Sequence, residues 1–286
     1  MEEQGTGNKK DTSKSVRMSS RMKLYIGFAI VVIVFVGLLI FTLQGHNAAN
    51  LVTYDNTLVP TSISGQLNVP NNISNIIGIG TAQYLDVLNK INNKPVLSQN
   101  GKVEILYIGA DYCPFCAAER WAMIIALSRF GNFSNLHFMT SSASDYSPST
   151  PTFTFYNSTY TSPYINFVSV EEYTNQISGS YYRQLQTPTN AELSLISHYD
   201  VNGTIPFILF ANYSYLIGAT YDPYSILYGK NWTTILQEIY NTSSVQSQSI
   251  IGSANLVTEQ ICNADNNTPK SVCSQPYVTK IRQIIG

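Results

Sequence analysis

Charged residues are scarce in this sequence, and neither sign dominates. Lys and Arg together number 16 and Asp and Glu number 17, so the formal net charge is −1. Nucleic-acid surfaces need clustered basic residues, and this balance therefore argues against nucleic acid as a partner. Histidine is also rare. We interpret His137 as a structural residue and His198 as a surface residue, and with His46 they form no metal-binding motif.

Cysteine is sparse as well, with four residues in two pairs: Cys113 with Cys116, and Cys262 with Cys273. Zinc sites usually take four ligands, often as two Cys-x-x-Cys pairs. The second pair has wider spacing than a zinc knuckle and lies in another segment. Copper would want Met or His partners, which are few near the first pair. We therefore predict no metal and no cofactor.

One run, LYIGFAIVVIVFVGLLIFTL over residues 24–43, is almost wholly apolar and carries no charge. A helix of this length spans about 30 Å, the thickness of a bilayer core. A buried helix of a soluble protein would carry a polar face, and this run has none. A cleavable signal peptide would have a shorter apolar region. We predict one uncleaved transmembrane helix.

The charges that flank this run predict its orientation. Six Lys and Arg residues lie in residues 1–23, and the next one after the run is Lys90. The positive-inside rule places residues 1–23 in the cytoplasm as a tail and the remainder outside the membrane. Eight Asn-X-Ser/Thr sequons all follow the run. They are compatible with a glycosylated exterior, although a chain rich in Asn, Ser and Thr also forms sequons by chance.

Beyond the membrane run, the pattern predicts a short linker and then an α/β domain. Residues 44–79 contain two prolines among many polar residues, and we predict a stalk. A helix is predicted over 82–91, a hairpin turn at 99–101, a buried strand over 103–108 and a helix over 117–130. The later predicted elements are strands at 136–140, 153–156 and 164–170, a helix at 190–199, strands at 203–210 and 215–220, a helix at 232–240, and one or two helices within 246–286.

This order combines a βαβ half with a ββα half. We predict a central mixed sheet flanked by helices over residues 80–245, with an insertion at about 141–200 and a helical extension over 246–286.

The first cysteine pair has the arrangement that thiol-disulfide exchange requires. Exchange needs an ionised, accessible thiol and a second thiol that resolves the mixed disulfide. Cys113 would cap the helix, where unpaired N–H groups favour a thiolate, and Pro114 would take the first helical position. Cys116 would lie one turn later and be more buried. We predict that Cys113 attacks and Cys116 resolves; a redox-inert disulfide is the alternative.

The stretch Ala110–Cys116, ADYCPFC, resembles the active-site turn of the thioredoxin-like superfamily, and Ile205-Pro206 resembles the cis-proline of that family. The resemblance implies a thioredoxin-like fold and a substrate-binding role for Pro206, Ile205 and Tyr112.

Two positions depart from the family pattern. Tyr107 occupies the position of the family's buried acid and cannot do its acid/base work at neutral pH, and Phe115 replaces the His of strongly oxidising bacterial relatives. The anchor, the Cys-Pro-Phe-Cys motif and the exterior rich in Tyr, Asn and Ser also resemble an archaeal family catalogued as a domain of unknown function.

Together these features predict a membrane-anchored, extracytoplasmic thiol-disulfide oxidoreductase. Its expected partners are envelope or secreted proteins with thiols or disulfides, and a membrane redox protein. Disulfides persist outside the cell, which favours oxidase or isomerase activity over a reductase fed by a transmembrane electron carrier. A redox-inactive binding module that presents Tyr146–Tyr182 is the main alternative, and a metal carrier ranks lowest. Cys262 and Cys273 are predicted to form a structural disulfide.

Overall fold

The computed structural model describes residues 29, 32–34, 36 and 51–286. The chain divides into two compact units, Met1–Gly45 and His46–Gly286. The predicted cytoplasmic tail and most of the predicted transmembrane helix, residues 24–43, lie outside the described residues. Within the part that is described, no helix is both long enough and apolar enough to cross a membrane. All elements named below belong to the second unit.

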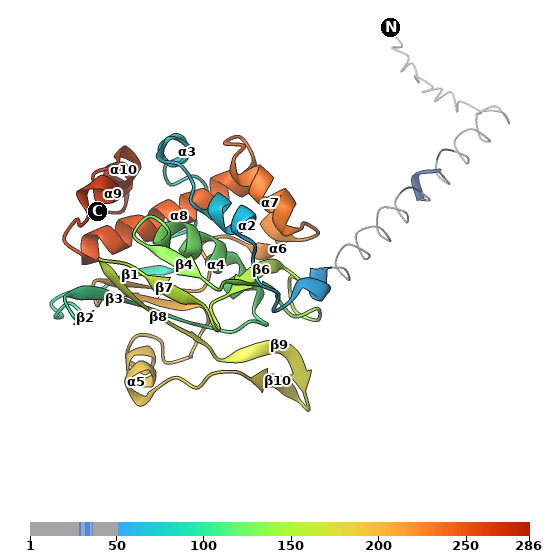
Figure 1. Ribbon diagram of the computed structural model, residues 1–286, viewed down its shortest axis with the longest axis horizontal. Coiled ribbons are helices and arrows are strands. Elements are labelled where there is room, and N and C mark those ends of the chain that lie inside the picture. The colour runs from blue at the N-terminus through green and yellow to red at the C-terminus, as the bar shows by residue number, and fades with distance from the viewer. Residues whose placement is uncertain (1–28, 30–31, 35, 37–50) are drawn as a thin grey trace, which may run out of the picture. The chain divides into compact units, whose positions relative to one another are not determined.

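A mixed six-stranded sheet forms the centre of this unit (Figure 1). Its strands are β1 (Leu88–Lys90), β2 (Ser98–Gln99), β3 (Lys102–Gly109), β8 (Ile165–Glu171), β11 (Phe207–Phe210) and β12 (Ser214–Ile217). β3 pairs in parallel with β8, and antiparallel with β11 and with the short β2. β11 pairs with β12, and β12 with β1, both antiparallel. The predicted α/β domain with a central mixed sheet and flanking helices is therefore confirmed.

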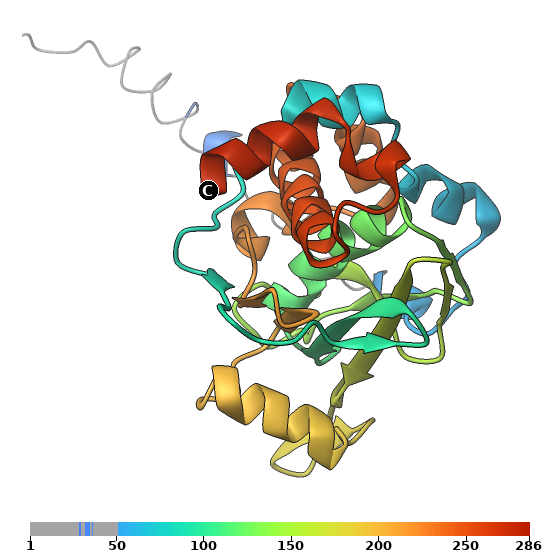
Figure 2. The same cartoon turned by 90° about the vertical axis from the view of Figure 1, so that its left-hand side faces the viewer.

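Side chains of β3 alternate between two buried faces of the sheet. Ile105 and Tyr107 join the larger hydrophobic core, whereas Leu106 and Ile108 join a smaller cluster on the other face. That smaller cluster packs against α5 (Asn190–Tyr199). Figures 1 and 2 show α5 on the opposite side of the sheet from α4 and α8. Burial on both faces explains the nearly continuous apolar sequence of β3.

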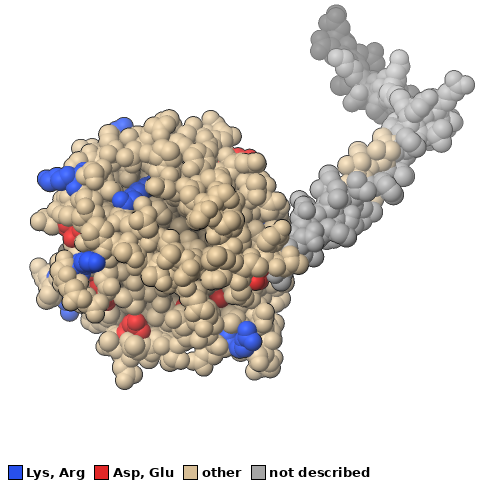
Figure 3. Space-filling model, viewed as in Figure 1, with Lys and Arg blue, Asp and Glu red and all other residues tan. Residues whose placement is uncertain are grey.

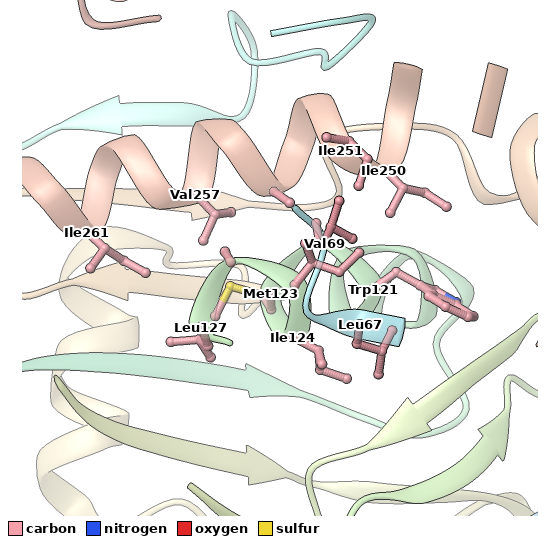
Figure 4. Close-up of a cluster of buried hydrophobic side chains, with 14 of the residues drawn as sticks. Leu67, Val69, Trp121, Met123, Ile124, Leu127, Ile250, Ile251, Val257 and Ile261 are labelled. Carbon is pink, nitrogen blue, oxygen red and sulfur yellow. The ribbon is translucent and has the colours of Figure 1, made fainter. Parts of the chain in front are cut away.

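The larger core lies around two helices, α4 (Pro114–Leu127) and α8 (Val245–Ala264). Every residue of α4 from Cys116 to Leu127 is buried. Figure 4 shows side chains of both helices in one cluster, with Met123 and Leu127 on α4 and Val257 on α8. The helix that carries the dithiol is thus fixed by packing along its whole length.

The other elements surround this core. The helices are η1 (Val52–Tyr54), α2 (Thr61–Ser64), η2 (Gly65–Leu67), α3 (Asn71–Ile77), α6 (Pro223–Leu227), α7 (Trp232–Ile239), α9 (Lys270–Cys273) and α10 (Pro276–Ile285). Three antiparallel strand pairs complete the described structure: β4 (Asn132–Ser134) with β7 (Thr159–Thr161), β5 (His137–Thr140) with β6 (Pro151–Thr154), and β9 (Tyr173–Ser178) with β10 (Tyr181–Gln184). Charged side chains are few and scattered on the face shown in Figure 3.

The predicted stalk is wrong for residues 51–79. This segment forms short helices against the core, and Leu67, Val69 and Ile77 are buried there. Its prolines precede helices rather than forming an extended linker, since Pro60 and Pro70 immediately precede α2 and α3. Burial of the apolar side chains between these polar residues stabilises the folded segment.

Two other predictions need correction. Residues 82–91 do not form a helix: a turn is followed by β1, because Leu88 pairs with Leu216 at the edge of the sheet. Residues 136–140 do not supply the second strand of the βαβ unit, because β5 pairs with β6 outside the central sheet. The parallel partner of β3 is β8, which lies within the predicted insertion. In each case pairing between distant segments overrode the local pattern.

Several local predictions are confirmed. Asn100 and Gly101 form the hairpin turn with φ of +52° and +75°, values that Asn-Gly adopts readily. α5 has the predicted bounds, and α7 ends one residue early. The predicted number of helices in the C-terminal extension is wrong: residues 246–286 contain most of α8 together with α9 and α10, which makes three helices rather than one or two.

Candidate dithiol site

Cys113 caps the N-terminus of α4, as the sequence predicts. Its backbone is extended, with φ −75° and ψ 121°, and its Sγ accepts a hydrogen bond from the Cys116 backbone N–H at 3.2 Å. Pro114 takes the first helical position, where its missing N–H costs no hydrogen bond. The chain reaches this cap directly from β3, through a loop in which the Cys113 N–H donates to the Ala110 carbonyl oxygen at 3.2 Å.

The two thiols differ in their tendency to ionise. Burial raises the pKa of Cys113, but hydrogen bonds from Cys116 and the charge of Arg120 outweigh it and hold that pKa below its usual value. Burial and the interaction with Cys113 raise the pKa of Cys116 well above its usual value. Cys113 is therefore the thiol that ionises first.

Burial of Cys113 differs from the sequence-based expectation. The residue is only 5 % exposed and Cys116 is 0 % exposed, whereas the sequence predicts a first sulfur that solvent can reach. The Cys113 Sγ lies under the loop before β11, 3.8 Å from the Ile205 carbonyl oxygen. The access of a reaction partner to this sulfur is therefore limited.

That loop brings the predicted substrate-binding residues to the dithiol. The Ile205-Pro206 peptide bond is cis, Pro206 is buried and Ile205 is half-buried. The loop leads into β11, and β11 pairs with β3, which leads into the Cys113 cap. Neighbouring strands thus place Ile205 and Cys113 together although they are 92 residues apart.

Two aromatic residues lie next to the cysteines in sequence, Tyr112 before Cys113 and Phe115 between Cys113 and Cys116. Tyr112 stacks on Tyr182 of β10, with ring centroids 4.0 Å apart and planes 2° apart, and its hydroxyl lies 3.0 Å from that of Tyr181. Phe115 is 38 % exposed and stacks on Tyr146. Aromatic side chains from three separate segments therefore lie close to the dithiol.

A buried ion pair lies next to the dithiol, and our sequence reasoning missed it. Arg120 follows Cys116 by four residues on α4. Its Nε and Nη2 donate to the two carboxylate oxygens of Glu171 on β8, at 2.8 and 2.6 Å. The same Nη2 donates to the Ala110 carbonyl oxygen at 2.7 Å. The only signal in the sequence was the pair Glu119-Arg120 within an otherwise apolar helix.

Asp111 belongs to the same buried cluster. Its Oδ1 lies 3.6 Å from Arg120 Nη2, and both residues are almost fully buried. Burial and the charge of Glu171 raise the pKa of Asp111 to about 7, although Arg120 opposes that shift. Tyr107 also lies in this region, and burial raises the pKa of its phenol well above the usual value. Tyr107 therefore holds its proton at neutral pH, as we expected from the sequence.

Cys262 and Cys273 form a disulfide that joins α8 to α9, as predicted. Both residues belong to the larger hydrophobic core and contribute nothing to the dithiol site. Among the described residues, no group of three or more His, Cys, Asp or Glu side chains is placed to hold a metal ion.

Comparison with known families gives one match. The family described as "Domain of unknown function (DUF929)" matches residues 87–263, which is more than half of the chain. The matched stretch contains the dithiol, the Ile205-Pro206 loop and the Arg120–Glu171 pair. No curated protein and no solved structure matches the chain.

Proposed function

The chain belongs to the DUF929 family, and we propose that this member is a thiol-disulfide oxidoreductase whose working centre is Cys113 and Cys116. One observation carries the proposal: two unpaired thiols at a helix N-terminus have pKa values shifted in opposite directions. A lowered pKa favours the attacking thiolate, whereas a raised pKa keeps the second thiol protonated until the mixed disulfide forms.

The exchange proceeds in two balanced steps. The Cys113 thiolate attacks one sulfur of a substrate disulfide, forms a mixed disulfide and releases the other substrate sulfur as a thiolate, which takes a proton. Cys116 then loses its proton and attacks the Cys113 sulfur, which releases the second substrate thiolate. That second thiolate also takes a proton. Counting the proton that Cys113 gives up when it ionises, the substrate gains two electrons and two protons, and the Cys113–Cys116 pair loses the same number. The reverse sequence introduces a disulfide into a substrate dithiol.

Three features support a thioredoxin-like fold as part of this proposal. The dithiol turn connects a central strand to a helix N-terminus, the parallel neighbour of that strand follows the helix in sequence, and the Ile205-Pro206 loop enters the antiparallel neighbour. In this arrangement Ile205, Pro206 and Tyr112 line the route to Cys113 and would contact the substrate chain.

We further propose that the domain works outside the cell membrane, tethered by residues 24–43. The lopsided Lys and Arg content around that apolar run supports this topology. The Cys262–Cys273 disulfide also supports it, since disulfides persist in extracytoplasmic compartments. The substrates would then be envelope or secreted proteins with thiols or disulfides, and a membrane redox protein would restore the dithiol.

Trapping of mixed disulfides in cells tests the activity. Cys116→Ser should accumulate disulfide-linked adducts, because the resolving thiol is gone. Cys113→Ser should form none, because the remaining thiol is buried and poorly ionised. Pro206→Thr should prolong adducts if Pro206 lines the substrate route. Non-reducing electrophoresis with mass spectrometry of the adducts is the measurement.

A redox-inactive binding module is the second candidate function. The observation that favours it is the low exposure of Cys113, which limits access to the sulfur. The two candidates give different results in one assay: a binding module leaves Cys116→Ser free of adducts, and the purified protein does not exchange with a small disulfide such as oxidised glutathione.

A further inference from the structure

We propose that the buried Arg120–Glu171 pair sets the reduction potential of the Cys113–Cys116 couple: Arg120 stabilises the Cys113 thiolate, and Glu171 limits that stabilisation. This inference rests on the proposed function and names the residues that control the reduction potential of its dithiol. Arg120 and Glu171 are positioning residues in this scheme, since they act through charge on the sulfur that reacts.

The guanidinium of Arg120 is fixed to the loop that carries Cys113. The Ala110 carbonyl oxygen accepts hydrogen bonds from both Arg120 Nη2, at 2.7 Å, and the Cys113 N–H, at 3.2 Å. On α4, Arg120 also follows Cys116 by four residues, so both lie on one face of the helix. Its positive charge is held beside the dithiol by two separate constraints.

The charge of Arg120 acts on the thiols with little screening. Arg120 and Glu171 are both 0 % exposed, and charges in such surroundings interact more strongly than charges in water. The charge of Arg120 acts to lower the pKa of both thiols; for Cys113 it adds to the net lowering, and for Cys116 it opposes the larger effect of burial. The bidentate contact with Glu171 offsets part of the positive charge, and Asp111 offsets a further part whenever it is ionised.

The sign of the effect follows from the couple itself. Reduction of the Cys113–Cys116 disulfide takes up two electrons and leaves a thiolate at Cys113, with the proton of that reduction on Cys116. A positive charge stabilises the reduced form and raises the potential, whereas a carboxylate next to that charge lowers it. Arg120 and Glu171 should therefore act in opposite directions.

The test compares Arg120→Met with Glu171→Gln in the full-length protein. Equilibration with glutathione buffers gives the potential, and ultraviolet absorbance of the thiolate gives the pKa of Cys113. Arg120→Met should raise that pKa by about one unit and shift the glutathione equilibrium about tenfold towards the disulfide, which is about 30 mV. Glu171→Gln should lower the pKa of Cys113 and shift the glutathione equilibrium towards the dithiol, each by about threefold in the equilibrium constant. The effect is smaller than that of Arg120→Met because Asp111 still offsets the charge of Arg120.

Two control variants separate charge from packing. Glu119→Gln neutralises an equally buried carboxylate on the residue next to Arg120, but Glu119 bonds to Thr220 and should leave the dithiol unchanged. Arg120→Lys keeps the positive charge, so its reduction potential should lie closer to that of the wild type than to that of Arg120→Met. If Arg120→Met does not fold, Glu171→Gln against Glu119→Gln still decides the question.

The outcomes distinguish this inference from the proposed function. A wild-type dithiol that never exchanges with glutathione overturns both. Normal exchange together with an unchanged Cys113 pKa in Glu171→Gln, or with a shift in the same direction as Arg120→Met, overturns the inference alone. Opposite shifts, with Glu119→Gln at the wild-type values, support it.

Discussion

Glu119 precedes Arg120 on α4, but its carboxylate serves a different part of the core. Its Oε2 accepts hydrogen bonds from the Thr220 N–H and hydroxyl at 2.9 and 2.8 Å, and no cation is paired with it in the described part of the chain. Burial raises the pKa of Glu119 to about 7 despite these bonds. The pKa of Asp111 is also raised to about 7, and that of Asp55 to about 6.

These raised pKa values predict that the folded state loses stability as pH rises. Between the ordinary carboxyl pKa and about 7, the folded state binds more protons than the unfolded chain. The stability that Glu119 contributes is therefore fully present below pH 4.5 and is lost as pH rises to about 7.

In Glu119→Gln, the fall in the free energy of unfolding between pH 4.5 and about 7 should be smaller than in the wild type by an amount on the order of 3 kcal/mol. Urea unfolding of wild type and Glu119→Gln at several pH values is the measurement. The remaining slope should come from the other carboxyl groups with raised pKa values, among them Asp111, Asp55 and Asp265, whose shifts have the same sign. Identical profiles for the two proteins would contradict the assignment.

The sequence predicts the place of a site residue when that residue belongs to a short local motif. Cys113, Pro114 and Cys116 lie in one short motif, so their places at the helix cap follow from spacing. Arg120 and Glu171 were not predictable, because the partners are 51 residues apart and meet only after β8 pairs with β3. The low exposure of Cys113 also depends on a distant loop, at Ile205.

At the scale of elements, the disulfide fixes the C-terminal helices to the core. Cys262 lies near the end of α8 and Cys273 at the end of α9, and both side chains are buried. A closed loop of this length restricts the unfolded chain and stabilises the fold by about 3 kcal/mol on the chain-entropy account.

Replacement of both residues, Cys262→Ala with Cys273→Ala, should lower the free energy of unfolding by about 3 kcal/mol. Exchange by Cys113 should stay at the wild-type rate, because the two cysteine pairs lie in separate parts of the structure. Denaturant unfolding and glutathione exchange measure the two effects. A loss of exchange in a variant that remains folded would show that this disulfide has more than a structural role.

Elements were predicted best where one segment determines its own structure. The hairpin turn at Asn100-Gly101 and the helix α5 follow from local turn and capping preferences. The sequence pattern misses β1, and it predicts the strand at 164–170 but assigns it to the insertion, because the place of each strand in the sheet depends on its neighbour: β12 for β1, and β3 for β8. The sequence predicts a stalk over residues 44–79, although residues 51–79 fold onto the core, because their few apolar residues become informative only once the core they cover is known.

At the scale of the whole molecule, the proposed topology places residues 44–286 outside the cell. Protease added to intact cells that express the protein should remove this part and leave a short membrane-bound fragment. A cytoplasmic marker protein should survive the same treatment. Protection of the C-terminal domain until the cells are lysed would contradict the topology and leave the dithiol in a reducing compartment.

The most direct measurement of the central claim is the mass of the purified protein across a series of glutathione buffers. The account predicts a reversible loss of two hydrogens, mapped by peptide analysis to Cys113 and Cys116, with the Cys262–Cys273 disulfide unchanged throughout. It also predicts that glutathione attaches to Cys113 in the Cys116→Ser variant. A protein whose Cys113 and Cys116 stay reduced and unmodified in every buffer would contradict the account.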